Sequence, residues 1–135
     1  PQYPLMKENH ICIARKCFFS SGVERDGQGN AGHNYTFEVF VYGPIDTVTG
    51  LVINLTDVNI ILAVITKQVD QKHLNYDLKL GSVEQIDIHE FIHNLFANEF
   101  KTKAPKNISF LKSKLLEGHF DETEIITTKG QEYFR

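Results

Sequence analysis

The sequence predicts a domain of the α+β class, in which two strands, two helices and two further strands follow one another. Apolar and aromatic side chains alternate along 35–42 with the period of a strand, and apolar residues recur at helical spacing along 58–65 and 88–100. Gly43-Pro44 ends the strand pattern before the first helical one. The chain contains no internal repeat, low-complexity tract or linker, so we expect one domain over residues 1–135.

The composition excludes several classes of protein and partner. With 14 Lys and Arg against 17 Asp and Glu, the formal charge is −3, and 41% of the residues are hydrophobic. This balance excludes disordered and collagen-like chains, and no basic cluster offers an electrostatic footprint for nucleic acid. The longest apolar run, Ile60–Ile65, is far shorter than the roughly 20 residues that cross a bilayer. We therefore expect neither nucleic acid nor a membrane as a partner.

The first strand is expected over Ile11–Ser21, which is rich in β-branched and aromatic residues, and it is expected to end at Gly22. Cys12 and Cys17 stand an odd number of residues apart in it, so they point to opposite faces and are not expected to form a disulfide. Reduced thiols favour a cytoplasmic protein. The glycines and charged residues of 23–32 predict a mobile loop.

The second strand is expected over Tyr35–Tyr42. Tyr35 and Phe37 belong to one face of this strand, whereas Phe40 and Tyr42 belong to the other. Because both faces carry aromatic side chains, we expect both to be at least partly covered by protein, one of them by a helical layer or by another subunit.

A first helix is expected from Thr56 or Asp57, either of which can cap its first turn, to about Gln68. Its buried stripe is expected to consist of Val58, Ile61, Leu62 and Ile65. The polar segment 69–81 predicts an irregular crossover to the second helix.

The second helix is expected to begin at Asp87, since Asp87 and Glu90 have the spacing of a capping box, and to end before Pro105. Its buried face is expected to consist of Ile88, Phe91, Ile92, Leu95, Phe96 and Phe100. Third and fourth strands are expected over 108–116 and 124–128.

The second helix carries the pattern HExxH, formed by His89, Glu90 and His93. On a helix this spacing places two imidazoles one turn apart with a carboxylate able to act on a metal-bound water, which indicates a zinc hydrolase. Such a site needs a third ligand, and only Glu117 or His119 could supply one through tertiary contact. The helical period assigns the core to their apolar neighbours, so we expect the two histidines on a solvated flank and keep the zinc hydrolase as a remote alternative.

Several strings of the first 75 residues share one further resemblance. They are Phe19-Ser20-Ser21, Asn30-Ala31-Gly32-His33-Asn34-Tyr35, Thr49-Gly50-Leu51-Val52-Ile53-Asn54-Leu55 and Asp70-Gln71-Lys72-His73-Leu74-Asn75. In type, order and spacing they resemble the 6-pyruvoyl-tetrahydropterin synthase family, which includes the bacterial 6-carboxy-tetrahydropterin synthases. The resemblance implies the T-fold: a four-stranded antiparallel sheet with two helices on one face. It also implies that copies assemble into an oligomeric barrel, commonly a hexamer made of two trimers, with the pocket between subunits.

The resemblance implies a zinc site, but this chain departs from it. In the family, three histidines bind one Zn²⁺. Here Val23 and Ala31 stand at the first two ligand positions, and only His33 remains. Because one imidazole does not hold zinc at useful affinity, we expect the family's zinc to be absent.

The family's catalytic groups are also reduced. Its proton-abstracting cysteine lies in the segment that corresponds to 24–30, which has no cysteine, and its Asp-His pair corresponds to Asp70 and Gln71. We therefore expect a pterin-binding paralogue that has lost zinc-dependent catalysis. The alternative is an active lyase on a dihydroneopterin triphosphate-like substrate, in which Glu24 or Asp26 transfers the proton.

The resemblance assigns ligand recognition to a C-terminal carboxylate that grips the amino-pyrimidine edge of a pterin. Glu117 corresponds to it, with Glu122 as a nearby alternative. Glu90 keeps an acid that in the family belongs to the substrate site. We expect the ligand-free protein to make no use of Glu117, so that Glu117→Gln would weaken ligand binding and leave stability unchanged.

Overall fold

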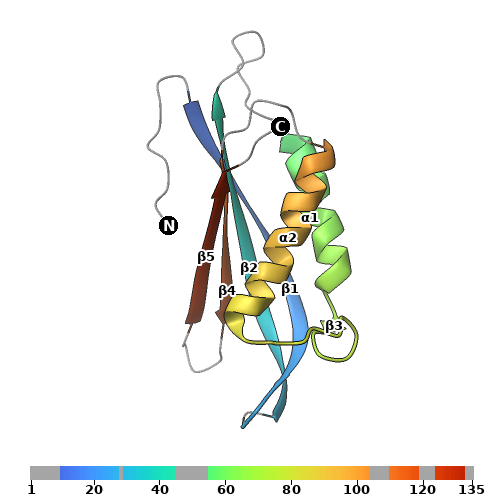
Figure 1. Cartoon of the computed structure of the whole chain (residues 1–135). Helices are drawn as coiled ribbons and strands as arrows, with labels where there is room; N and C mark the ends of the chain where they lie inside the picture. Colours follow the sequence, from blue (N-terminus) through green and yellow to red (C-terminus); the bar gives the residue numbers. More distant parts are fainter. Residues whose placement is uncertain (1–9, 28, 45–54, 104–109, 119–123, 133–135) are drawn as a thin grey trace.

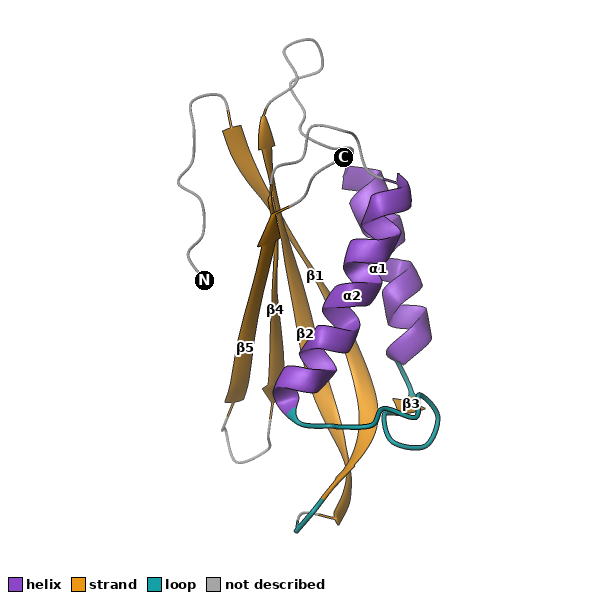
Figure 2. Ribbon diagram, in the orientation of Figure 1, coloured by secondary structure: helices purple, strands orange, loops and turns teal. Residues whose placement is uncertain are grey.

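In the part of the chain that the structure describes, five strands form a sheet in the order β3-β1-β2-β4-β5, and two helices cover one of its faces (Figures 1 and 2). The computed structural model describes residues 10–27, 29–44, 55–103, 110–118 and 124–132. The elements are β1 (His10–Arg25), β2 (Gly29–Pro44), α1 (Leu55–Val69), β3 (Lys72–His73), α2 (Gln85–Lys103), β4 (Phe110–Gly118) and β5 (Glu124–Glu132). The α+β class and the order of the main elements are confirmed. Neither helix is long and apolar enough, within the described residues, for a bilayer crossing.

The prediction of a loop over 23–32 is wrong. Strand β1 continues through Gly22 to Arg25, and β2 begins at Gly29, which pairs with Arg25. Gly27 and Gly29 adopt φ angles of 77° and 72°, which glycine reaches without a steric penalty. The glycines therefore form a tight turn between two long strands.

The end of this hairpin extends beyond the rest of the sheet. Pairing between β2 and β4 starts at Asn34, opposite Gly118, so, within the described residues, 29–33 pair with β1 and not with β4. Residues 21–25 and 29–33 thus form a twisted ribbon below the helices (Figure 1), to which β3 adds a short pairing at Ser21 and Gly22. His33 lies on this ribbon, and so do Val23 and Ala31, which stand at the positions of the two missing zinc ligands.

The crossover between the helices contains a strand that the sequence did not indicate. In β3, Lys72 and His73 pair in parallel with Ser21 and Gly22, so the sheet has five strands within the described residues rather than the four expected. Two residues are too few to show a period in the sequence, because one alternation is indistinguishable from a turn.

Helix α2 begins two residues earlier than the capping-box spacing predicts. The carbonyl of Glu84 accepts the first bonds, from the backbone N–H groups of Asp87 and Ile88. Asp87 instead accepts a hydrogen bond from the Ser82 hydroxyl at 2.6 Å, and so ties the first turn to the preceding loop. Its negative charge still lies in the first turn, where it favours the helix dipole.

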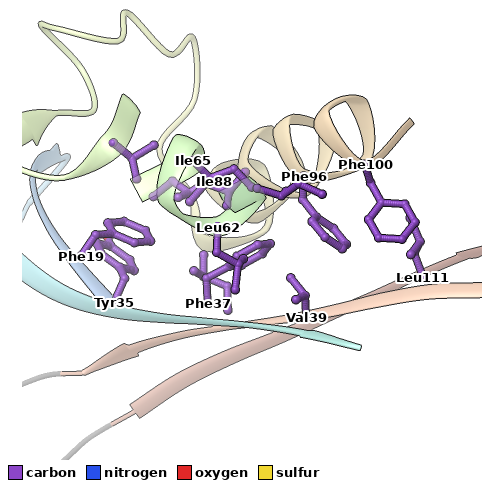
Figure 3. Packing of buried hydrophobic residues seen from close by; sticks show 14 of the residues in the cluster. Phe19, Tyr35, Phe37, Val39, Leu62, Ile65, Ile88, Phe96, Phe100 and Leu111 are labelled. Carbon is purple, nitrogen blue, oxygen red and sulfur yellow. The ribbon is translucent and has the colours of Figure 1, made fainter. Parts of the chain in front are cut away.

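The hydrophobic core lies between the sheet and the helices (Figure 3). Alternate residues of β2 supply its floor and are at most 1% exposed: Tyr35, Phe37, Val39 and Val41. Helix α1 packs over β1, and α2 packs over β4 and β5. The cysteines follow the same alternation, since Cys12 is exposed, Cys17 is half-buried and both are free thiols.

We expect Gly22→Ala to destabilise the protein. A Cβ at this position would lie 2.7 Å from Cδ2 of His73, and that ring is held by a 2.9 Å bond from Nε2 to Asn30 and by backbone N–H groups of Asn75 and Tyr76 at Nδ1. Moving it costs about 1–3 kcal/mol of the free energy of unfolding, measured by denaturant titration.

Gly32→Ala is the matched control. Gly32 pairs directly with Gly22, yet a Cβ there meets no atom of the described residues within 4 Å. This variant should be as stable as the unmodified chain or slightly more so, because alanine restricts the unfolded state. Equal stability of the two variants would contradict the packing of His73 on Gly22.

Candidate functional site

A pocket of about 410 Å³ opens where β1, β2 and β3 meet. Two residues predicted from the sequence, His33 and Gln71, line it together with side chains such as Ser20, Asn34 and His73. Ser20 donates from its hydroxyl to Oδ1 of Asn34 at 2.6 Å, so β1 and β2 are also tied through side chains here. The side chains that line the pocket are therefore polar. They come from three of the segments that carry the resemblance to the family.

The positions that the resemblance assigns to zinc ligands lie side by side. Val23 pairs directly with Ala31, and His33 follows Ala31 on the same face of β2. Val23 is 1% exposed and belongs to the hydrophobic core. An isopropyl and a methyl group offer no lone pair, so these residues do not fit a zinc ion. Across the described ranges, no group of three His, Cys, Asp or Glu residues is placed to hold a metal.

Asp70 has a structural partner at the end of α1. Its Oδ1 accepts a hydrogen bond from the backbone N–H of Ser20 at 2.9 Å and a longer one, 3.4 Å, from Nε2 of Gln71. Next to it, the buried Ser21 hydroxyl donates to the carbonyl of Val69 at 2.7 Å. Asp70 and Gln71 thus anchor the C-terminal end of α1 to β1 beside the pocket.

Glu24 and Asp26 are not among the residues that line the pocket. Both are exposed, and Glu24 lies on the opposite face of β1 from Val23. Its carboxylate accepts a hydrogen bond from the hydroxyl of Tyr76, whose ring stacks on His73 with centroids 4.4 Å apart. The structure therefore places Glu24 beside Tyr76 and does not join it to His33.

Glu117 lies in a buried ion pair. It is 0% exposed, and its two oxygens accept from Nη1 and Nη2 of Arg25 at 2.9 Å each. The Tyr35 hydroxyl donates to Oε1, and Nε of Arg25 donates to the carbonyl of Val83 at 2.9 Å. This group, which we call the Arg25–Glu117 network, joins β1, β2, β4 and the loop before α2.

The network fixes the charge of its members. Burial alone would raise the pKa of Glu117, but the hydrogen bonds from Arg25 and Tyr35 and the charge of Arg25 together hold it below its usual value. Burial and the bond to Glu117 raise the pKa of Tyr35. At neutral pH the network therefore consists of a carboxylate, a guanidinium and a neutral phenol.

The expectation that the ligand-free protein makes no use of Glu117 is wrong, because Arg25 already pairs with it. Arg25 was not predicted as a site residue, because it lies 92 residues away from Glu117 along the chain and belongs to a segment that was predicted to be a loop. The one local indication is that Arg25 lies two residues after Val23, so that in a strand both side chains would lie on the same face.

The expectation that His89 and His93 lie on a solvated flank is also wrong. They are 0% and 1% exposed, and Nε2 of His89 and Nδ1 of His93 both contact the Ser113 hydroxyl of β4. Nδ1 of His89 contacts the Thr127 hydroxyl at 2.6 Å. Burial, followed by the charges of His93 and Lys129, lowers the pKa of His89 to about 3. The ring nitrogens thus serve a buried polar cluster between α2 and the sheet.

Among the residues that the structure describes, no third ligand completes a metal site with these histidines. Glu90 is exposed on α2, away from the buried cluster. Glu117 is held by Arg25 instead. His119 and Glu122 lie outside the described residues.

We expect the purified protein to carry well under one zinc per chain by elemental analysis, because the donor set does not fit the ion. A variant with Val23→His and Ala31→His restores three imidazoles on one ribbon face and should bind zinc. Stoichiometric zinc in the unmodified protein would contradict the expectation, and His33→Ala compared with His89→Ala would then locate it.

Comparison with known proteins agrees with this arrangement. A sequence profile of the family described as 6-pyruvoyl tetrahydropterin synthase matches residues 7–126. A 6-pyruvoyl tetrahydrobiopterin synthase of Drosophila melanogaster is 49% identical over 49 residues, which are 36% of this chain and 29% of that protein. One of Poecilia reticulata is 52% identical over 48 residues, which are 35% of this chain and 33% of that protein. The matched segments thus span about a third of these curated relatives.

Solved structures share the fold along almost the whole chain. The 6-pyruvoyl tetrahydropterin synthase of Caenorhabditis elegans superposes with a TM-score of 0.73 at 17% identity, over 93% of this chain and 97% of that one. A Plasmodium vivax 6-pyruvoyltetrahydropterin synthase, in which a glutamate described as a catalytic residue is replaced by alanine, gives 0.71 at 13% identity, over 93% and 100%. At these identities the likeness concerns the fold.

Proposed function

This chain belongs to the 6-pyruvoyl tetrahydropterin synthase family, and from this premise we propose that it binds a pterin-like small molecule without zinc-dependent catalysis. The observation that carries the proposal is the pairing of Val23 with Ala31 beside His33. Both apolar residues stand at the expected ligand positions, and one of them has become part of the core. A catalytic zinc site needs three protein ligands, so this change removes the metal's role.

Ligand recognition is assigned to Glu117. A pterin presents an amino group and a ring N–H side by side, and a single carboxylate can accept from both. Glu117 is a buried carboxylate at the end of β4 that accepts a hydrogen bond from Tyr35, and its pairing with Arg25 keeps it ionised while no ligand is bound. An ionised acceptor in a largely dry site favours such a charge-assisted pair. Asp70 and Glu90 remain candidates for supporting roles.

An active lyase is the second candidate function. A glutamate is described as a catalytic residue in Plasmodium vivax 6-pyruvoyltetrahydropterin synthase, and by analogy an acid of this chain would take the catalytic role, since 24–30 contains no cysteine. Glu24 is the better placed acid, since its carboxylate already bonds to the hydroxyl of Tyr76 next to His73. Formation of product from dihydroneopterin triphosphate, lost in Glu24→Gln and retained in Asp26→Asn, would favour this candidate over the first.

Binding is tested by titrating the unmodified protein with pterin and with lumazine, in which an oxo group replaces the 2-amino group. Lumazine loses one N–H donor and turns an oxygen toward the carboxylate. We therefore expect it to bind about ten- to a hundredfold more weakly than pterin, which corresponds to about 1.5–3 kcal/mol. No saturable pterin binding at millimolar concentration, or equal affinity for the two rings, would refute the proposal.

We also propose that copies of the chain assemble through their sheets into the barrel that the family resemblance implies, with the sheet face opposite the helices turned inward. Phe18, Thr36, Leu116 and Ile126 form one row across four strands of this face. Phe18 is 67% exposed and Ile126 is 51% exposed. Apolar side chains in such a row favour burial against another copy.

The solution mass should therefore exceed the 15.4 kDa of one chain several-fold, consistent with a hexamer made of two trimers. Phe18→Lys should lower the mass measured by light scattering. Ile60→Lys, at an exposed apolar position of α1, should leave it unchanged. A monomeric mass of the unmodified protein at micromolar concentration would contradict assembly.

A further inference from the structure

The guanidinium of Arg25 makes the same kind of contact with Glu117 that the amino-pyrimidine edge of a pterin would make. Both groups are flat and present two parallel N–H donors to the two oxygens of one carboxylate. In this protein those two bonds are Nη1 to Oε2 and Nη2 to Oε1, each of 2.9 Å. A ligand edge and Arg25 cannot hold the same pair of oxygens at once.

We propose that Arg25 is a built-in cap that occupies the ligand anchor of this chain and must leave Glu117 before a pterin-like ring can bind. This inference rests on the proposed function and adds a control element to it. The cap is supplied by the chain itself, from the last residue of β1, so its local concentration at the anchor is high and independent of dilution.

Burial shows that the anchor is closed when Arg25 is in place. Glu117 is 0% exposed, while the side chain of Arg25 is 10% exposed. Oε1 also accepts from Tyr35, and Nε of Arg25 is held by the carbonyl of Val83. Both oxygens are thus engaged, and a ring has no route to them that leaves the ion pair intact.

The positions of Arg25 and Glu117 in the sheet indicate which of the two side chains moves away when the ligand binds. Glu117 lies on β4, which is paired on both sides by β2 and β5, so its backbone is fixed by two strands. Arg25 lies next to the turn at Asp26 and Gly27, and among the described strands its backbone is paired on one side, with Gly29. Rotation of one side chain brings the guanidinium to water, whereas the Glu117 carboxylate keeps the Tyr35 hydroxyl as a donor until the ligand binds.

A cap of this kind lowers the apparent affinity for the ligand. Binding is reduced by the fraction of molecules in which the anchor is open, because only that fraction is competent. Removing the cap should therefore strengthen binding. If the ion pair were purely structural, removing Arg25 would not raise the affinity for pterin, because Glu117 would not be part of the binding site.

The test is a pterin titration of the unmodified protein, Arg25→Ala, Arg25→Lys and Arg15→Ala. We expect Arg25→Ala to bind pterin at least about tenfold more tightly than the unmodified protein. Arg25→Lys should give a smaller gain, since an ammonium keeps the charge but cannot form the two-pronged contact. Arg15→Ala removes an exposed arginine from the same strand and should change nothing. The double variant Arg25→Ala, Glu117→Gln should lose the gain.

Thermal unfolding provides a readout that does not depend on pterin. Arg25→Ala should melt at a lower temperature, because it leaves a buried carboxylate without its cation. Millimolar methylguanidinium should raise that temperature in Arg25→Ala but not in the double variant, since the free ion fills the place of the missing head. If Arg25→Ala does not fold, Arg25→Lys, which retains the charge, carries the same comparison.

The outcomes separate the cap from the proposed function. Equal pterin affinity of the unmodified protein and both Arg25 variants would overturn the cap and leave pterin binding in place. Pterin binding by none of the folded variants would overturn both, and the ion pair would then be structural only. A gain that survives Glu117→Gln would overturn the assignment of Glu117 as the capped anchor.

Discussion

The ion pair between Arg25 and Glu117 is the interaction on which the lower end of the molecule depends. Taking two charges out of water is costly, and it is tolerated only when their hydrogen-bonding groups are matched. Here both carboxylate oxygens and three guanidinium nitrogens have partners within the network. Because those partners come from β1, β2, β4 and the loop before α2, the pair holds the projecting ribbon against the body of the fold.

The ribbon is also held by apolar packing where the family resemblance places a metal. Val23 is 1% exposed and belongs to the core cluster, so the ribbon face contributes burial instead of ligands. A metal site stabilises a fold by binding energy, whereas a buried valine stabilises it by removing apolar surface from water. The same pair of backbone positions, 23 and 31, can therefore support metal binding when it carries histidines or apolar packing when it carries valine and alanine, as here.

A second polar cluster lies between α2 and the sheet. It gives a structural reason for the HExxH pattern, which by itself indicates a zinc hydrolase. Residues four apart on a helix share a face, so a face that buries His89 also buries His93. The Ser113 hydroxyl contacts Nε2 of His89 and Nδ1 of His93, and the Thr127 hydroxyl contacts Nδ1 of His89. The spacing that suits a metal therefore also suits two imidazoles around one hydroxyl, and burial rather than spacing distinguishes the two.

The sequence by itself determined the parts of this protein that are governed by local periods and by consecutive motifs. Alternation along Tyr35–Tyr42 identified the core face of β2, the helical stripes identified both helices, and the strings around His33 and Asp70 identified the family. Those signals survive because a strand or helix repeats every two or 3.6 residues whatever surrounds it.

Only the tertiary structure decided the rest. The glycines of 23–32 suit a loop or a tight hairpin equally, and pairing of β1 with β2 selected the hairpin. The contact between Arg25 and Glu117 joins residues 92 positions apart, and the burial of His89 depends on which side of α2 meets the sheet. Such choices are made by partners distant in sequence, because a charge or an imidazole carries no local mark of what it will face once the chain has folded.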